Sequence, residues 1–425
     1  MIRIIDKNIN RSEILNRELA SFPQFEESVK QIIANVIENK DKALYEYCEK
    51  FDKVSLSSLV VSPEEIEQAY RSVSADFVEI LKKAKNNVEE YHRMQVRHGF
   101  ELKKEDGIVL GQKITPIERA GIYVPGGTAS YPSTVIMNAV PAKIAGVSRI
   151  VMTTPPGKDG RIKAEILVAA DLCGVDTVIK CGGAQAIAAL AYGTESVPKV
   201  DKIVGPGNIF VALAKKQVFG TVSIDMIAGP SEILVIADEK ADPVQLACDL
   251  LSQAEHDRLA TAVLVTNSGE LALKVQAELE LQIAKLERSE IARASIDDNG
   301  KIIVVESIEK AVEISNIIAP EHLEICVEDP FKYLDSIENA GSVFLGKYSP
   351  EPLGDYFAGP NHTLPTGGSA RFSSALSVDD FIKKTQFMYY TEEALSKVYK
   401  DIATFARAEG LGAHARAVEA RFEKD

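Results

Sequence analysis

GIYVPGGTASYPSTVIMNAVPAKIAG, residues 121–146, joins a short apolar run to a segment whose apolar residues have helical spacing. The same pairing recurs in RIVMTTPP (149–156) with KAEILVAADLCG (163–174), in DTVIKCGG (176–183) with AQAIAALAYG (184–193), and in DKIVGPGN (201–208) with IFVALAKKQV (209–218). The apolar runs contain few polar residues, which is typical of strands covered on both faces. This alternation therefore predicts a parallel sheet with helices on both sides.

A second series of the same kind follows. The runs EILVIADE (232–239), TAVLVTN (261–267) and KIIVV (301–305) alternate with predicted helices at 241–255, 269–287 and 308–317. Apolar spacing predicts helix almost throughout 24–100, and helical segments at 391–408 and 412–424 end the chain. The sequence thus predicts an α/β fold with two Rossmann-like parallel-sheet domains, a helical N-terminal region and a helical C-terminal tail.

The composition predicts a soluble, cytoplasmic globular protein. Apolar residues make up 46% of the 425 residues, and the formal net charge is −14. A chain this acidic repels phosphate backbones and anionic lipid, so neither nucleic acid nor a membrane is expected as a partner. The start MIRIIDKNINRSEI lacks the apolar stretch of a signal peptide. Five scattered cysteines without CxxC spacing favour a reducing compartment over disulfides or a thiolate zinc finger.

Four of the six histidines stand in unusual local sequences, and His92 and His98 lie in a charged segment where solvent exposure is predicted. In LLSQAEHD, Gln253 and His256 are three apart near the end of a predicted helix, so both can face one side. Such nitrogen and oxygen ligands suit zinc. Pairs at this spacing are common, however, and on this evidence alone an exposed helix end is the favoured interpretation.

Glu321 and His322 follow a proline at the end of a predicted helix. A carboxylate and an imidazole that converge from a turn can supply general acid–base chemistry near neutral pH. A charged turn without any such role explains the two residues equally well.

The loop at 349–362 is rich in Gly and Pro, and long loops of this kind are often functional. Asp355 and His362 are its strongest polar candidates, whereas Tyr356 and Phe357 are predicted to pack. An ordinary acidic loop is the preferred interpretation of this segment by itself.

In EGLGAH, Gly410 and Gly412 predict a break between the last two helices. The break would let Glu409 and His414 turn toward a site elsewhere. An exposed C-terminal helix is the alternative interpretation.

Glycine clusters follow the predicted strands at 126–127, 182–183, 205–207 and 229–230. At the carboxyl ends of parallel strands they would form the usual cofactor crevice of an α/β sheet. None completes GxGxxG, so dinucleotide binding and general phosphate binding both remain open.

Taken in order, these motifs resemble one family, the histidinol dehydrogenases, over nearly the whole chain. The resemblance lies in YVPGG (123–127), CGGAQAIAALAYGTESVPKVDKIVGPGN (181–208), IDMIAGPSEILVIAD (224–238), DLLSQAEH (249–256), EISNIIAPEHLEI (313–325), SVFLG (342–346), SPEPLGDYFAGPNHTLPT (349–366) and EGLGAH (409–414). The departures are small: CGGAQ stands where the family often has VGGAQ, and AEHD stands for the common AEHG. Neither departure changes a residue that the resemblance implies as a metal ligand.

The resemblance implies site residues as well as a family. It implies that one Zn²⁺ per subunit is bound by Gln253, His256, Asp355 and His414, and that Glu321 and His322 handle protons. The substrate contacts that it implies are Ser231, Gln253, His256, His322, Asp355, His362, Glu409 and His414, and the NAD contacts are Tyr123, Gln185 and Asn208.

The implied reaction oxidises L-histidinol to L-histidine through L-histidinal with two NAD, as the last step of histidine biosynthesis. Cys326 lies in an apolar strand where an inert thiol is expected, so water activated by Glu321 is the simpler hypothesis for the aldehyde step, with His322 as base. A paralogous NAD and zinc dehydrogenase for another small alcohol is the first alternative. A non-catalytic nucleotide- or metal-binding protein is the second.

The resemblance also implies a homodimer whose C-terminal segment reaches into the partner. The expected division has residues 18–122 and 232–376 in a first α/β domain with the metal and catalytic residues, and residues 123–231 in a second domain on the NAD side. Residues 1–17 and 377–402 are expected to form a small extension, and residues 403–425 a helical dimerisation tail.

Overall fold

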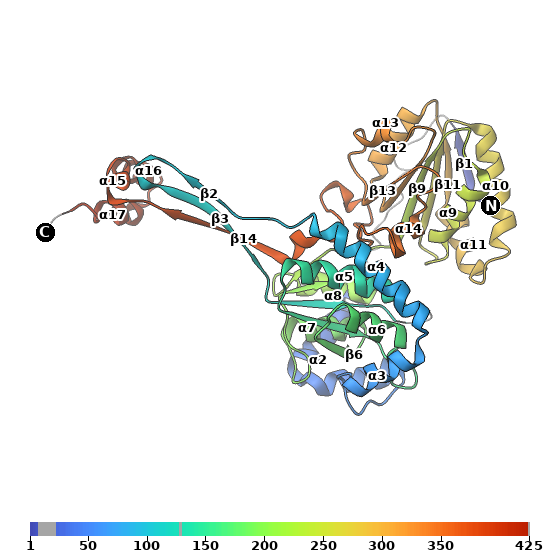
Figure 1. The fold of residues 1–425 in the computed structure, drawn as a ribbon, viewed down its shortest axis with the longest axis horizontal. Coiled ribbons are helices and arrows are strands. Elements are labelled where there is room, and N and C mark those ends of the chain that lie inside the picture. The colour runs from blue at the N-terminus through green and yellow to red at the C-terminus, as the bar shows by residue number, and fades with distance from the viewer. Residues whose placement is uncertain (7–22, 127–129, 424–425) are drawn as a thin grey trace. The chain divides into compact units, whose positions relative to one another are not determined.

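The computed structural model describes residues 1–6, 23–126 and 130–423 (Figure 1). It divides into two compact units. Unit 1 comprises Met1–Gln95 and Ile117–Phe381, and unit 2 comprises Val96–Pro116 and Ile382–Asp425.

Unit 1 contains a five-stranded parallel sheet with the order β6-β5-β4-β7-β8. Its strands are β4 (Arg119–Tyr123), β5 (Arg149–Thr154), β6 (Thr177–Lys180), β7 (Lys202–Val204) and β8 (Ser223–Ile224). The helices between them are α5 (Pro132–Ala145), α6 (Ala164–Leu172), α7 (Gly183–Tyr192) and α8 (Ile209–Val218). Counted along the chain the order is 3-2-1-4-5, which is that of a doubly wound fold with its switch point between β4 and β7.

Unit 1 also contains a six-stranded parallel sheet with the order β1-β11-β10-β9-β12-β13. Its strands are β1 (Arg3–Asp6), β9 (Glu232–Ala237), β10 (Thr261–Thr266), β11 (Lys301–Val304), β12 (His322–Cys326) and β13 (Ser342–Leu345). Its helices are α9 (Pro243–Ala254), α10 (Gly269–Ile283), α11 (Ser289–Asp298), α12 (Ile308–Ile318), α13 (Phe331–Leu334) and α14 (Glu351–Tyr356). Without edge strand β1 the order is again 3-2-1-4-5, with the switch point between β9 and β12. The two predicted Rossmann-like sheets are therefore confirmed.

Each sheet of unit 1 has buried apolar clusters on both faces. In β9, Ile233 and Val235 face one cluster, whereas Leu234 and Ile236 face the other. In the five-stranded sheet, Ile122 faces one cluster and Tyr123 faces the other. Side chains alternate along a strand, so apolar residues at successive positions are needed to fill both faces. The continuous apolar runs of the sequence satisfy that need.

The N-terminal helices pack on the helices that cover the five-stranded sheet. The N-terminal elements are α2 (Pro23–Tyr47), the π-helical turn η1 (Cys48–Asp52), α3 (Pro63–Ser72) and α4 (Ala75–Arg93). Helix α2 lies against α7 and α8, α3 against α6, and α4 against α5. Val29 of α2 shares a cluster with Ile187, and Val88 of α4 shares one with Ile150. This differs from the expected division, which joined residues 18–122 to 232–376. An amphipathic helix shows in its sequence that one face is buried but not which sheet buries it.

Unit 2 contains an antiparallel sheet, β14-β3-β2, that the sequence did not predict. Its strands are β2 (Phe100–Lys103), β3 (Val109–Pro116) and β14 (Ile382–Tyr389), followed by helices α15 (Glu392–Ser396), α16 (Tyr399–Ala408) and α17 (Gly412–Glu419). All of β2 and nearly all of β14 are exposed, so neither strand carries the alternation that would have revealed it. The predicted helix break is confirmed, since Gly410 has φ +78° between α16 and α17. The 3₁₀ turns in the described residues are η2 (Glu105–Gly107), η3 (Ser369–Arg371) and η4 (Val378–Phe381).

The boundaries expected for the extension also differ from the structure. The described part of residues 1–17 includes β1, which pairs with β11 in the six-stranded sheet. In the described ranges, no helix has the length and apolar character needed to span a bilayer. All five cysteines are unpaired.

Candidate active site

The switch point of the six-stranded sheet brings Glu321 and His322 onto the backbone of Glu232. An Oε of Glu321 accepts the Glu232 N–H at 2.8 Å, and His322 Nδ1 lies 2.9 Å from the Glu232 carbonyl oxygen. A carbonyl can only accept, so His322 Nδ1 carries the proton of the neutral ring. Its Nε2 is therefore a lone-pair acceptor, and this atom is buried without a hydrogen-bond partner among the described residues.

Helix α14 presents two carboxyl groups to this free nitrogen. His322 Nε2 lies 3.9 Å from a carboxyl oxygen of Glu351 and 3.9 Å from one of Asp355. The two acids are four residues apart and share one helix face. With His322 they form a group whose donor atoms are close enough to hold a metal ion. Asp355 was predicted as a site residue, whereas Glu351 was missed, and its only sequence signal was its spacing from Asp355.

Gln253 lies in the last turn of α9, with both atoms of its side-chain amide buried and without partners in the described structure. His256 follows in the next turn, where its N–H donates to the Gln253 carbonyl at 3.1 Å, and its side chain is exposed. Charge on His256 would disfavour protonation of His322, which places the two imidazoles within electrostatic reach.

His362 joins the same group through Asp355. Its Nδ1 donates to the Asp355 carbonyl at 3.0 Å and lies 3.8 Å from an Asp355 carboxyl oxygen. Ser231 is half-buried and directly precedes Glu232 at the start of β9. The Gln253 amide lies within reach of the Glu351 carboxyl. Gln253, His322, Asp355 and His362, all predicted from the sequence, thus lie in one group.

Burial controls the protonation of this group. It raises the pKa of Glu321 well above its usual range and lowers the pKa of His322 and of His362 to about 4. It also raises the pKa of Glu351 and Asp355, which face each other. The buried Asp355 carboxyl, the unpartnered Gln253 amide and the His256 imidazole are oxygen and nitrogen donors of the kind that a divalent cation such as zinc prefers. The residues present therefore fit zinc.

This group lies at the amino ends of its strands, because Glu232, Thr261 and His322 are the first residues of β9, β10 and β12. Ligands of open α/β sheets usually bind at the carboxyl ends. The arrangement arises because Gln253 and His256 end a helix that leads into β10, and because the turn 319–321 leads into β12.

The residues predicted to contact NAD lie instead at the carboxyl ends of the five-stranded sheet. Tyr123 ends β4 beside the switch point, and its hydroxyl accepts the Gly183 N–H at 3.1 Å. Gln185 is buried in the first turn of α7. Asn208 caps α8, where its side-chain oxygen accepts the N–H groups of Phe210 and Val211. Three of the four glycine clusters follow strands of this sheet, although Gly127 lies outside the described residues.

A buried ion pair fixes the glycine loop at this edge. Lys215 and Asp225 are paired, with side chains 2% and 1% exposed. Asp225 also accepts the N–H of Gly205 at 2.7 Å and of Met226 at 2.6 Å, while Lys215 donates to the Gly205 carbonyl at 2.9 Å. Gly205 has φ +112°, and a Cβ there would meet the Tyr123 carbonyl at 2.1 Å. Only glycine suits this position.

Some predictions for single side chains were wrong. His92 is fully buried rather than solvated, because it lies on the inner face of α4. Tyr356 and Phe357 do not pack but are 61% and 38% exposed. His98 is exposed as predicted. Glu409 and His414 belong to unit 2 and are exposed within it.

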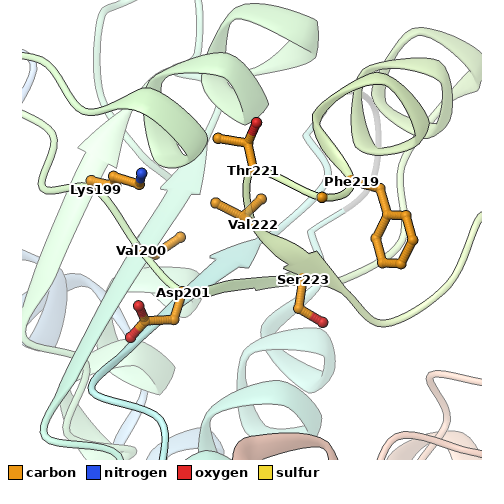
Figure 2. A pocket seen from close by; sticks show the side chains of 8 residues that line it. Lys199, Val200, Asp201, Phe219, Thr221, Val222 and Ser223 are labelled. Carbon is orange, nitrogen blue, oxygen red and sulfur yellow. The ribbon is translucent and has the colours of Figure 1, made fainter. Parts of the chain in front are cut away.

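Cys326 is half-buried in β12, and burial raises the pKa of its thiol, as expected for an inert cysteine. A hollow of about 390 Å³ lies elsewhere, at the amino end of β8, lined by residues 199–201 and 219–223 (Figure 2). Its one carboxylate, Asp201, is held by the backbone N–H groups of Glu118 and Arg119. This hollow therefore holds none of the predicted site residues.

The family model described as histidinol dehydrogenase matches residues 15–422. The chain belongs to the histidinol dehydrogenase family. A histidinol dehydrogenase of Clostridium acetobutylicum is 61% identical over 93% of this chain and 92% of its own length. One from Streptococcus mutans is 53% identical over the full length of both chains.

The crystal structure of histidinol dehydrogenase from Elizabethkingia anophelis has the same fold, with a TM-score of 0.94 at 39% identity over 99% of this chain and 98% of the other. Membership in the histidinol dehydrogenase family makes the chain an enzyme, an NAD-dependent oxidoreductase, as the sequence predicted.

Proposed function

We propose that the chain oxidises L-histidinol to L-histidine through L-histidinal, with two NAD, as the final step of histidine biosynthesis in the cytoplasm. The observation that carries the proposal is the free, buried Nε2 of His322 beside the carboxyl groups of Glu351 and Asp355. Family membership supplies the substrate class.

The reaction balances as two hydride removals with one addition of water. In the first, the alcohol loses its O–H proton and a hydride leaves the carbon for NAD, which yields the aldehyde. Water then adds to the carbonyl to form a hydrate. The hydrate loses a proton and a second hydride, and the resulting acid ionises to the carboxylate.

His322 is the base that takes the O–H proton in both oxidations. Its Nδ1–H is held by the Glu232 carbonyl, so Nε2 is the accepting atom, and it must release the first proton to solvent before it takes the second. Burial favours the neutral, proton-accepting form of the ring at neutral pH.

Glu321 activates the water that adds to the aldehyde. One of its carboxyl oxygens accepts the Glu232 N–H, which leaves the other for water. Burial raises the pKa of Glu321, so the ionised form of this group is a stronger base than an exposed carboxylate.

Gln253, His256, Asp355 and His414 would hold Zn²⁺, which when bound orients the amine and imidazole nitrogens of the substrate. Ser231, His362 and Glu409 complete the substrate contacts in this proposal. Tyr123, Gln185 and Asn208 bind NAD at the switch point of the five-stranded sheet, where dinucleotides usually lie.

We place Glu409 and His414 in the site of a partner subunit. Unit 2 has large exposed apolar side chains, among them Phe100, Met388 and Phe405, and its only buried apolar residues in the described range are three alanines. So small a core supports association with a second copy.

To test the proposal, a limiting amount of histidinol is added to the zinc-loaded protein with excess NAD, and the NADH and the product are measured. The proposal predicts two NADH per histidinol, histidine as the product, and loss of activity on chelation that zinc restores. Negligible NADH would favour the paralogous dehydrogenase for another small alcohol. One NADH per histidinol, with aldehyde accumulating, would exclude the double oxidation.

A further inference from the structure

His92, in the last turn of α4, is a buried histidine that the proposed reaction does not use. Its Nδ1 lies 2.8 Å from the Val88 carbonyl, which can only accept, so Nδ1 carries the proton of the neutral ring. Its Nε2 is then an acceptor, and the side-chain nitrogen of Asn361 faces it at 3.3 Å. The ring also has a backbone hydrogen-bond partner at Leu376. The imidazole is thus held by the Val88 carbonyl, by Leu376 and by Asn361.

Asn361 has every polar group of its side chain engaged. Its Nδ2 donates to the Met137 carbonyl at 2.6 Å as well as to His92, and its Oδ1 accepts the Thr363 N–H at 2.9 Å. Because the Met137 carbonyl only accepts and the Thr363 N–H only donates, the amide cannot be flipped. The orientation of residue 361 is therefore fixed by three partners.

The sequence explains why the Met137 carbonyl is available. In an α-helix this carbonyl would accept the N–H of the residue four positions on, which here is Pro141, inside α5. Proline has no N–H, so it leaves the carbonyl without its helical partner. Asn361 supplies the missing donor.

Helix α4, which carries His92, also holds the part of the chain that follows α14. The side-chain nitrogen of Asn87 donates to the Phe357 carbonyl at 2.8 Å. Gly359 has φ +114° and lies against Asn87, since a Cβ there would meet the Asn87 carbonyl at 2.7 Å. Helix α4 thus contacts the loop at Phe357 and Gly359, and again at Asn361, directly before His362.

We propose that His92 is a positioning residue for His362, acting through Asn361. The inference rests on the proposed function, in which His362 contacts the substrate. Held by His92 and the Met137 carbonyl, Asn361 sets the backbone from which the His362 ring reaches the Asp355 carbonyl. We call His92 and Asn361 the clamp. It would support the binding of histidinol and leave the binding of NAD unaffected.

The test compares His92→Phe, which keeps a ring but loses the acceptor, with His92→Gln, whose amide oxygen can accept from Asn361. Loss of one such hydrogen bond predicts a KM for histidinol raised about tenfold in His92→Phe and changed less than about threefold in His92→Gln. The KM for NAD and the zinc content should stay unchanged in both variants. In a His362→Ala background, His92→Phe should cause no further rise.

If His92 had a purely structural role, His92→Phe would raise the KM for histidinol and the KM for NAD together, or would still raise the KM for histidinol in the His362→Ala background. Either result would overturn the proposal. The ring signals of ¹⁵N-labelled histidine provide a readout that needs no turnover. The signal of His362 should shift in His92→Phe and in Asn361→Ala but not in His92→Gln. If the wild type does not oxidise histidinol, the proposed function fails, and an unmoved His362 signal would independently refute the clamp.

Discussion

Glu321 and His322 are neighbours in the chain that reach opposite polar groups of one residue, the N–H and the C=O of Glu232. The two contacts orient the side chains separately. Glu321 can act on water with its other oxygen, whereas His322 presents Nε2. This separation gives the two groups different tasks in the proposed reaction.

Replacing Glu321 by Gln should therefore slow the aldehyde step by about 10²–10⁴-fold, the usual contribution of a general base, and slow the alcohol step much less. Single-turnover assays that start from histidinol or from histidinal measure the two steps separately. Equal slowing of both would contradict this division of work. His322→Asn is the matched variant, and it should slow both steps.

At the residue scale, the sequence could predict side chains that lie in long motifs but not those whose role arises from packing. Gln253, His322, Asp355 and His362 were predicted, and the structure brings them together. Glu351 and His92 were missed, because their burial depends on which elements cover α14 and α4. A histidine in a charged helical segment carries no local sign that one face of the helix is covered.

The elements of unit 1 were predictable because their strands are buried on both faces and their helices carry clear apolar spacing. The antiparallel sheet of unit 2 was not, since β2 and β14 are exposed on both faces. The placement of α2, α3 and α4 on the helices that cover the five-stranded sheet was also missed. Periodicity identifies an element and its buried face, but the partner follows only from the tertiary fold.

The loop after β7 depends on the buried Lys215–Asp225 pair, so breaking that pair should destabilise unit 1. Lys215→Met leaves a buried carboxylate with backbone donors only, and we expect a loss of about 3–5 kcal/mol in the free energy of unfolding. The exposed pair Lys274–Glu270 is the control, and Lys274→Met should cost about 1 kcal/mol or less. Urea unfolding measures both variants. Equal losses would contradict a special role for the buried pair.

At the scale of the whole molecule, the proposed active site needs two subunits. Glu409 and His414 belong to unit 2, whereas Gln253, His256 and Asp355 belong to unit 1. A shared site predicts complementation between a His414→Asn subunit and a Glu321→Gln subunit. In a mixed dimer, one site combines the intact unit 1 of the His414→Asn subunit with the intact unit 2 of the Glu321→Gln subunit.

Random mixing of equal amounts should restore about a quarter of the wild-type sites, because half of the dimers are mixed and each has one intact site. Steady-state activity after unfolding and refolding the mixture measures this. If the mixture is no more active than the two variants assayed separately, the sites are not shared. Wild-type protein refolded in the same way controls for losses during refolding.

A crystal structure of the protein with zinc and histidinol would test the shared zinc site directly. We expect zinc on Gln253, His256 and Asp355 of one subunit and His414 of the other, with His322 Nε2 facing the alcohol oxygen. The group formed by His322, Glu351 and Asp355 offers a competing set of ligands. Zinc bound there, with His322 as a ligand, would remove the proposed base and refute the proposed reaction.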